Sequence, residues 1–280
     1  MAYTRDALIV SAIVGKQGHG KDGDLIAWRS TDGGNSWSSP ARVNDVPGSA
    51  REGLHAMAAG GNDTLFAAWL DLRASGTRVY GSTSTNGGAT WSPNRLVYES
   101  ASGTVCQCCH PSVAVDATGR IYVMFRNVLG AARDFYLTQS DDGGQTFGEG
   151  RKLGTGTWKL EACPMDGGGL SVDERGQVST AWRREGTVYT TSGDRPEQAL
   201  AEGRNPTIAA THSETVTAWT DQGVVRLRGP ASSETRTLGE GAFPVLMALP
   251  DGTPLVAWEN KGSIRVLPLA PGAGDTEAGK

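Results

Sequence analysis

The residues of this chain best suited to chemistry are its four cysteines, because they are confined to two short segments. Three of them stand close together in the run Cys106-Gln107-Cys108-Cys109-His110, and the fourth opens the run Cys163-Pro164-Met165. Thiolate, thioether and imidazole groups together favour a soft ion, with Cu(I) as the first choice and Zn(II) as the second. The candidate metal ligands are Cys106, Cys108, Cys109, His110, Cys163, Met165 and His55, with His19 as an outer candidate.

The same cysteines allow two other interpretations. A disulfide between Cys106 and Cys163 would form in an oxidising compartment and would leave Cys108 and Cys109 as an adjacent pair or as free thiols. A reactive thiol at Cys109, activated by His110, is the third interpretation, although neighbouring residues in a strand point to opposite sides. The sequence therefore predicts a metal site first and leaves disulfide and thiol chemistry open.

The elements that must position these residues can be inferred from an internal repeat. Three segments share a Ser–polar–Asp/Asn–Gly–Gly pattern that ends in an aromatic residue: Ser30–Trp37, Ser84–Trp91 and Ser140–Phe147. Each follows a strand-like run, its Asp or Asn can accept hydrogen bonds from turn N–H groups, and its glycines can adopt positive φ. The repeat therefore predicts three hairpin turns at equivalent places in three similar units.

This pattern resembles the Asp-box, or bacterial neuraminidase repeat, of sialidase-like β-propellers. Hairpins with an aromatic at the end of their second strand extend the count along the chain, and they end at Trp69, Phe125, Trp182, Trp219 and Trp258. We therefore expect an all-β, six-bladed β-propeller of four-stranded antiparallel blades, as a single domain over residues 1–270 with a disordered tail over 271–280. The first blade is predicted to be one strand short. One way to complete it is a blade that combines strands from the two ends of the chain.

The propeller topology predicts where the cysteines lie. Loops alternate between the two faces, and the segments that enter each first strand end beside the central axis, where propellers usually bind ligands. All four cysteines fall in such entering segments. Alignment of neighbouring blades on Asp116 and Asp173 places Cys106 level with Cys163. The two sulfur-bearing segments are therefore expected to meet.

The resemblance also implies glycoside hydrolysis as an alternative function. Sialidases hold a carboxylate with three arginines and use a Tyr–Glu pair and an acidic Asp, but their Arg-Ile-Pro signature is absent from this sequence. Charges in the loops of the same face, such as Asp71, Arg73 and Arg126, are expected to be part of a solvated rim. A non-catalytic binding or assembly propeller with structural disulfides is the other alternative, and the sequence leaves open whether the protein is an enzyme.

Composition narrows the range of partners. With 20% charged residues and a net charge of −4, the chain offers no electrostatic basis for binding nucleic acid. No apolar run approaches the roughly 18 residues that a membrane span needs. The start lacks a secretory signal, but a removed signal would leave the same sequence, so we expect a periplasmic or secreted protein and leave a cytoplasmic one open. The expected partners are a metal ion and a metal-delivery or electron-transfer protein.

Overall fold

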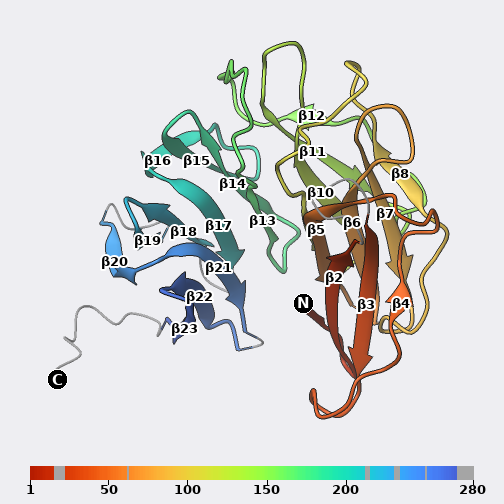
Figure 1. Ribbon diagram of the computed structural model, residues 1–280. Coiled ribbons are helices and arrows are strands. Elements are labelled where there is room, and N and C mark those ends of the chain that lie inside the picture. Colours follow the sequence, from red (N-terminus) through yellow and green to blue (C-terminus); the bar gives the residue numbers. More distant parts are fainter. Residues whose placement is uncertain (16–22, 62, 212–214, 230–233, 250, 270–280) are drawn as a thin grey trace. The chain divides into compact units, whose positions relative to one another are not determined.

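The computed structural model describes residues 1–15, 23–61, 63–211, 215–229, 234–249 and 251–269, without the side chains of residues 52 and 53 (Figure 1). Every regular element in these ranges is a β-strand. Accordingly, they contain no helix that is long and apolar enough to cross a membrane. The predicted tail over 271–280 and His19 lie outside the described residues. The chain divides into two compact units, Met1–Gly168 and Gly169–Lys280.

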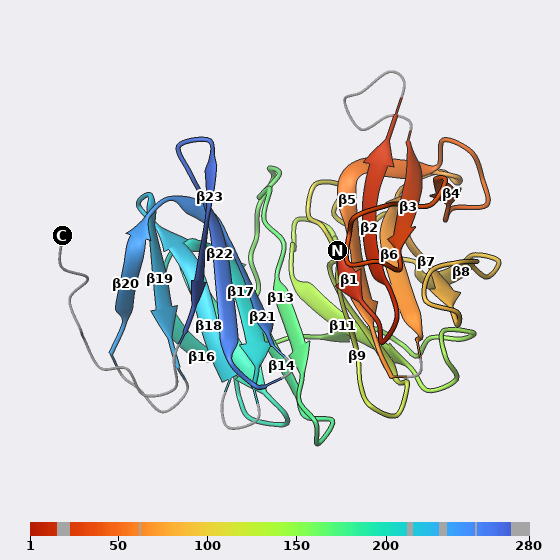
Figure 2. The same ribbon diagram turned by 90° about the horizontal axis from the view of Figure 1, so that it is seen from below.

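The first unit holds three four-stranded antiparallel sheets, which are its blades. Their strands are β1 (Ala2–Tyr3), β2 (Leu8–Val14), β3 (Asp24–Ser30) and β4 (Ala41–Arg42); β5 (Ala50–Ala59), β6 (Leu65–Asp71), β7 (Arg78–Ser84) and β8 (Arg95–Tyr98); and β9 (Ser112–Val115), β10 (Ile121–Arg126), β11 (Phe135–Ser140) and β12 (Arg151–Lys152). Figure 2 shows β2 and β3 running alongside β5 and β6.

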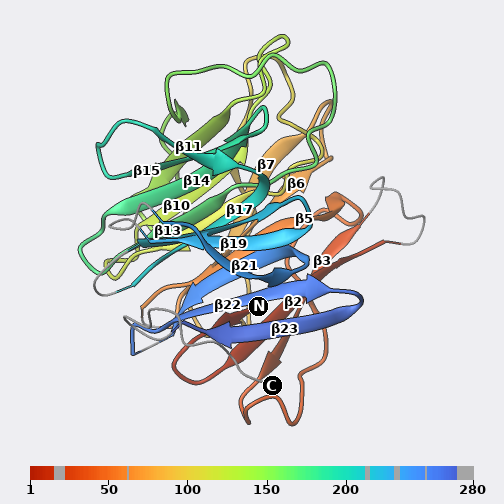
Figure 3. The ribbon, with the colours of Figure 1, turned by 90° about the vertical axis from the view of Figure 1, so that its left-hand side faces the viewer.

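The second unit holds two further four-stranded sheets and one three-stranded sheet in its described residues (Figure 3). Their strands are β13 (Gly169–Val172), β14 (Val178–Arg184), β15 (Thr187–Ser192) and β16 (Gln198–Glu202); β17 (Arg204–Ala210), β18 (Thr215–Asp221), β19 (Val224–Arg228) and β20 (Arg236–Glu240); and β21 (Ala242–Ala248), β22 (Pro254–Asn260) and β23 (Ser263–Pro268).

These six antiparallel sheets confirm the predicted all-β fold with six propeller blades. The expectation that the first blade lacks a strand was wrong, because Ala2 and Tyr3 pair with Ile9 and Leu8 and form its first strand. That strand is only two residues long, and a sequence pattern of period two needs about four residues to be recognised. The prediction of a single domain over 1–270 stays a prediction.

The core of the first unit lies between its blades, and β6 shows how the sequence achieves this. All seven residues of β6 are buried. Leu65, Ala67 and Trp69 pack into one cluster with residues of the first blade, whereas Phe66, Ala68 and Leu70 pack into another with residues of the third. Because successive side chains of a strand point to opposite faces, an unbroken apolar run is what a strand covered on both faces requires.

The predicted Asp-box turns are confirmed between the third and fourth strands of the first three blades. In the first, backbone N–H of Ser36 donates to Asp32 Oδ1 at 2.9 Å and that of Gly34 donates to Ser30 Oγ at 2.9 Å. Both glycines of this box have positive φ, 73° at Gly33 and 92° at Gly34. Hydrogen bonds to its carboxylate, first from the Ser36 hydroxyl and then from the Ser36 N–H, lower the pKa of Asp32 to about 2. The box carboxylate therefore serves its own turn.

Candidate functional site

The cysteine loop, residues 105–111, connects β8 to β9 and is fixed at its start by backbone hydrogen bonds. Val105 N–H donates to the carbonyl of Thr77, and Cys106 N–H donates to the carbonyl of Arg126, both at 2.9 Å. This pairing extends β10 by an isolated bridge between Val105 and Asn127. As a result Cys106 points into the protein and is only 1% exposed.

A disulfide joins the cysteine loop to the facing loop, residues 161–168, which leads into β13. The bond links Cys108 to Cys163 across 55 residues of sequence, with a Cα–Cα distance of 6.2 Å. The structure thus brings the two sulfur-bearing segments together, but it corrects the expected pairing of Cys106 with Cys163. The reason is burial: Cys106 is anchored to β10 and buried, whereas Cys163 is exposed and meets the half-buried Cys108.

The two remaining cysteines are free thiols beside this disulfide. Cys106 and Cys109 are both buried, at 1% exposure each. The Cys106 Sγ lies 3.5 Å from the Cys109 Sγ and 3.7 Å from the Cys108 Sγ. The ligand atoms of Cys106, Cys108 and Cys109 all lie within 4.8 Å of one another. The cluster therefore brings three sulfurs close together, and one of them, that of Cys108, is held in the disulfide.

The thiols Cys106 and Cys109 do not share the same acidity. The hydrogen bond with Cys109 lowers the pKa of the Cys106 thiol to about 6, against the opposing effect of burial. Backbone N–H of Cys108 and the positive charges of Arg126 and Arg133 add to this lowering. The same sulfur–sulfur hydrogen bond, followed by burial, raises the pKa of Cys109. The pair therefore favours one thiolate and one thiol that donates to it.

One cation that acts on both thiols is Arg126, the last residue of β10. Its side chain is 1% exposed and its guanidinium lies over the Phe135 ring at 4.1 Å and near the Trp158 ring at 5.1 Å. It donates to the carbonyl of Arg133 at 2.8 Å and to that of Asp166 at 3.5 Å. The expectation that Arg126 belongs to a solvated rim was therefore wrong. Sequence reasoning missed its role because only the fold places the end of β10 beneath the cysteine loop.

A glycine in the facing loop allows the two loops to approach closely. A Cβ added at Gly167 would lie 2.0 Å from Nε2 of His110, far inside van der Waals contact. The His110 Nδ1 lies 3.1 Å from the Pro111 carbonyl oxygen, within hydrogen-bond distance. Ser112 Oγ also donates to the Gly168 carbonyl. The run Cys163 to Gly167 therefore contacts the cysteine loop at both ends, through the disulfide of Cys163 and the close approach of Gly167 to His110.

The other predicted ligands lie outside the group of three sulfurs. His110 and His55 are not part of it, and Met165 is 71% exposed at a positive φ of 52°. His55 Nε2 lies 3.0 Å from Ser11 Oγ. Burial, followed by the nearby N-terminal amino group, lowers the pKa of His55 to about 4, so its imidazole is neutral at neutral pH. Ligation of a metal by these residues stays a prediction.

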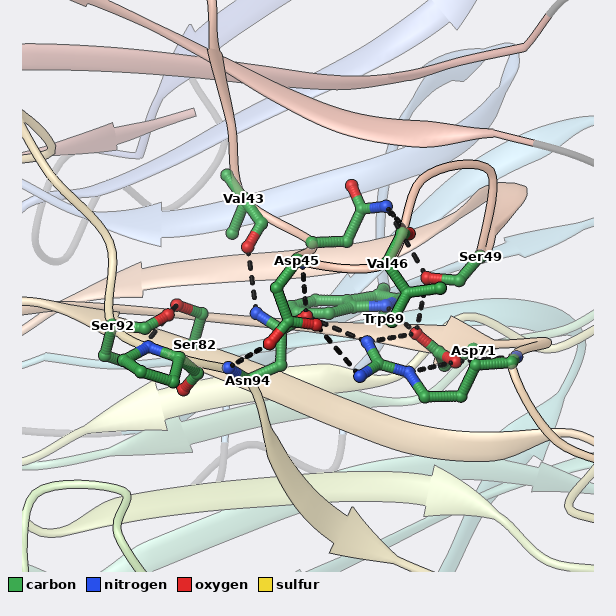
Figure 4. A network of polar contacts seen from close by, with 12 residues as sticks. Val43, Asp45, Val46, Ser49, Trp69, Asp71, Ser82, Ser92 and Asn94 are labelled. Carbon is green, nitrogen blue, oxygen red and sulfur yellow. Dashed lines mark hydrogen bonds and ion pairs between the residues drawn. The ribbon is translucent and has the colours of Figure 1, made fainter.

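A second polar network lies at the end of β6 and is built differently (Figure 4). The buried Asp71 accepts hydrogen bonds from Trp69 Nε1 at 2.8 Å, from Ser49 Oγ at 2.9 Å and from Arg73 Nε at 2.8 Å. Arg73 also pairs with Asp45 at 2.9 Å. Asp71 is therefore a structural residue with both carboxylate oxygens engaged, and the expectation that it belongs to a solvated rim was also wrong.

Taken together, six antiparallel blades and Asp-box turns define a sialidase-like β-propeller. The chain matches the BNR repeat-like domain family over residues 1–165, and it belongs to this family. No curated protein matches it in sequence. The family membership agrees with the resemblance drawn from the repeated turns.

Solved structures show the same fold at low sequence identity. The chain is similar to the Hadza microbial sialidase Hz136, with a TM-score of 0.63 and 14% identity over 96% of this chain and 64% of that chain. It is also similar to the Penicillium chrysogenum alpha-L-arabinanase, with a TM-score of 0.63 and 13% identity over 94% and 89%. A six-bladed fungal lectin from Aleuria aurantia gives a TM-score of 0.57 and 8% identity over 96% and 93%. The chain thus spans just under two thirds of the length of the sialidase chain.

Proposed function

We propose that the reduced cysteine cluster binds one soft metal ion, Cu(I) in the first place, through the sulfurs of Cys106, Cys108 and Cys109. The observation that carries the proposal is the sulfur spacing of 3.5 and 3.7 Å. An ion with metal–sulfur bonds of about 2.3 Å holds its sulfurs about 3.8 to 4.0 Å apart in tetrahedral or trigonal geometry. Only small shifts of the side chains would therefore be needed to close the site around an ion.

Metal binding in this proposal requires reduction of the disulfide. A sulfur bonded to Cys163 is not a thiolate, so the Cys108–Cys163 bond must be reduced before Cys108 can act as a ligand. Reduction also frees Cys163 as a fourth thiol on the facing loop. The disulfide itself fits a periplasmic or secreted protein, because disulfides persist in oxidising compartments. The proposed metal-delivery or electron-transfer partner must therefore meet the chain with this disulfide reduced.

The choice of Cu(I) over Zn(II) follows from ligand number and charge. Three thiolates suffice for a soft ion, whereas structural zinc is almost always bound by four ligands. The buried guanidinium of Arg126 offsets part of the negative charge of the thiolates. We therefore expect Cys163 to be dispensable for Cu(I) and required for tight Zn(II) binding. His110, Met165 and His55 are auxiliary ligands at most.

The test is an anaerobic titration of the fully reduced protein against a chromophoric Cu(I) chelator. The wild type should remove one equivalent of Cu(I) from the chelator, Cys106→Ser and Cys109→Ser should lose this ability, and Cys163→Ser should keep it. Met165→Leu is the matched control, since it removes an exposed thioether of the facing loop and should change nothing. Failure of the reduced wild type to compete with the chelator would reject the proposal.

Glycoside hydrolysis is the second candidate function. It is supported by membership of the BNR repeat-like family and by the fold shared with a sialidase and an arabinanase. It ranks second because the Arg-Ile-Pro signature is absent and because Asp71 is engaged by Trp69, Ser49 and Arg73. Release of a fluorophore from an aryl sialoside or an aryl arabinoside by the purified protein, at a rate above that of heat-inactivated protein, would establish it.

A further inference from the structure

The disulfide and the two free thiols form a chemically unusual arrangement, because a thiol lies directly against a disulfide sulfur. The Cys106 Sγ is 3.7 Å from the Cys108 Sγ, which is itself bonded to Cys163. The same Cys106 Sγ is 3.5 Å from the Cys109 Sγ. The Cys106 sulfur therefore contacts a disulfide sulfur, that of Cys108, and a second thiol, that of Cys109.

We propose that the cluster has thiol–disulfide exchange activity, in which Cys106 attacks the Cys108–Cys163 disulfide and releases Cys163 as a surface thiol. The activity goes beyond metal binding and does not depend on it. It would make Cys163 a modification site whose availability is controlled from inside the protein. The released Cys163 thiol would react with a thiol-reactive electrophile or with the disulfide of another protein.

The exchange balances without an outside oxidant or reductant. In the first step the Cys106 sulfur forms a bond to the Cys108 sulfur, the Cys108–Cys163 bond breaks, and its electron pair leaves on Cys163. The proton lost by Cys106 is replaced at Cys163 from solvent. In the second step Cys109 gives up its proton and its sulfur forms a bond to the Cys106 sulfur. The Cys106–Cys108 bond breaks with its electron pair on Cys108, which takes up a proton from solvent. The chain keeps one disulfide throughout.

Burial gives the exchange a direction. Cys106 and Cys109 are each 1% exposed, whereas Cys163 is exposed. A disulfide between Cys106 and Cys109 would lie in the interior, out of reach of outside thiols, and the released sulfur of Cys163 would be hydrated at the surface. An external reagent would therefore meet Cys163 and not the thiols that generated it.

The test traps the released thiol in protein that has never been reduced. The native protein, freed of small thiols by gel filtration, is incubated with N-ethylmaleimide, quenched in acid, and mapped by peptide mass spectrometry without reduction. We expect N-ethylmaleimide on Cys163, together with a disulfide that joins Cys106 to Cys108 or to Cys109. Recovery of the Cys108–Cys163 disulfide alone, or labelling of Cys163 without a new bond at Cys106, would overturn the proposal.

Two variants resolve the steps. Cys106→Ser should abolish labelling of Cys163, because it removes the thiol that lies 3.7 Å from the Cys108 sulfur. Cys109→Ser should keep the labelling and stop the exchange at the Cys106–Cys108 disulfide. Unchanged labelling in Cys106→Ser would also overturn the proposal. The wild-type map decides the matter even if a variant fails to fold, and a negative result would leave Cu(I) binding by the reduced protein untouched.

Discussion

The Asp-box turns and the cysteine loop both gather reactive or polar side chains within a few residues, but the bonding partners of these side chains come from different places in the chain. In the box, Asp32 accepts hydrogen bonds from residues within four positions along the chain. In the cysteine loop, Cys108 is bonded to a residue 55 positions away and Cys106 pairs with the backbone of β10. The box carboxylate is therefore used by its own turn, whereas the cysteine loop keeps two unbonded thiols, Cys106 and Cys109.

The first way to sharpen this comparison is to remove the cation below the cysteine loop. Arg126→Met should lower the free energy of unfolding by about 3 kcal/mol, because the carbonyls of Arg133 and Asp166 lose a buried charged donor. Arg29→Met, at a half-buried arginine that donates to the carbonyl of Gly87 beside an Asp-box, should cost less than about 1 kcal/mol. Denaturant unfolding measures both. Equal losses of unfolding free energy in the two variants would contradict the predicted difference between the two arginines.

The second prediction concerns the acidity of Cys106. Because the hydrogen bond with Cys109 is the largest cause of its lowered pKa of about 6, Cys109→Ala should raise that pKa toward the ordinary thiol value. Cys109→Ser retains a hydroxyl donor and should raise it less. Ultraviolet absorbance of the thiolate against pH measures the shift. A Cys106 thiol that titrates alike in the wild type and in Cys109→Ala would contradict the assignment.

The third prediction tests how closely the two loops are matched. Gly167→Ala places a methyl group against the His110 ring and should lower the free energy of unfolding by about 1 kcal/mol. His110→Ala in the same chain should restore most of that loss, because the ring is what the methyl group meets. Denaturant unfolding of the two single variants and the double variant measures the coupling. Additive losses would show that the clash lies elsewhere.

The smallest effect is expected at the Asp-box itself. Since the pKa of Asp32 is held at about 2, its stabilising effect is complete above the pKa of an unfolded aspartate, about 3.9, and is lost as pH falls through about 2. Asp32→Asn should flatten this part of the stability profile and keep the turn, as Asn86 does in the second box, where its Oδ1 accepts from Thr90 N–H. Thermal unfolding midpoints between these pH values provide the measurement. A wild-type slope in the variant would contradict it.

Much of the fold could be predicted because its signals are local. Each Asp-box spans eight residues, and the covered strand β6 opens with a run of six apolar residues. The first strand, Ala2–Tyr3, could not be found, because two residues carry no periodicity. Part of the site could be predicted, because the meeting of the two cysteine segments follows from the topology. The disulfide partner of Cys163 could not, because the backbone hydrogen bond from Cys106 to Arg126 turns Cys106 inward and leaves Cys108 to form the bond.

The sequence by itself determined the blades, the turns and the two segments that carry sulfur, since hydrogen bonds within a turn and alternation along a strand depend only on near neighbours. Only the tertiary structure decided that Cys108 pairs with Cys163, that Cys106 and Cys109 remain as adjacent thiols, and that Arg126 is buried beside them. These are contacts between residues far apart in the chain, and their distances are set by how strands and loops pack, which no local pattern encodes.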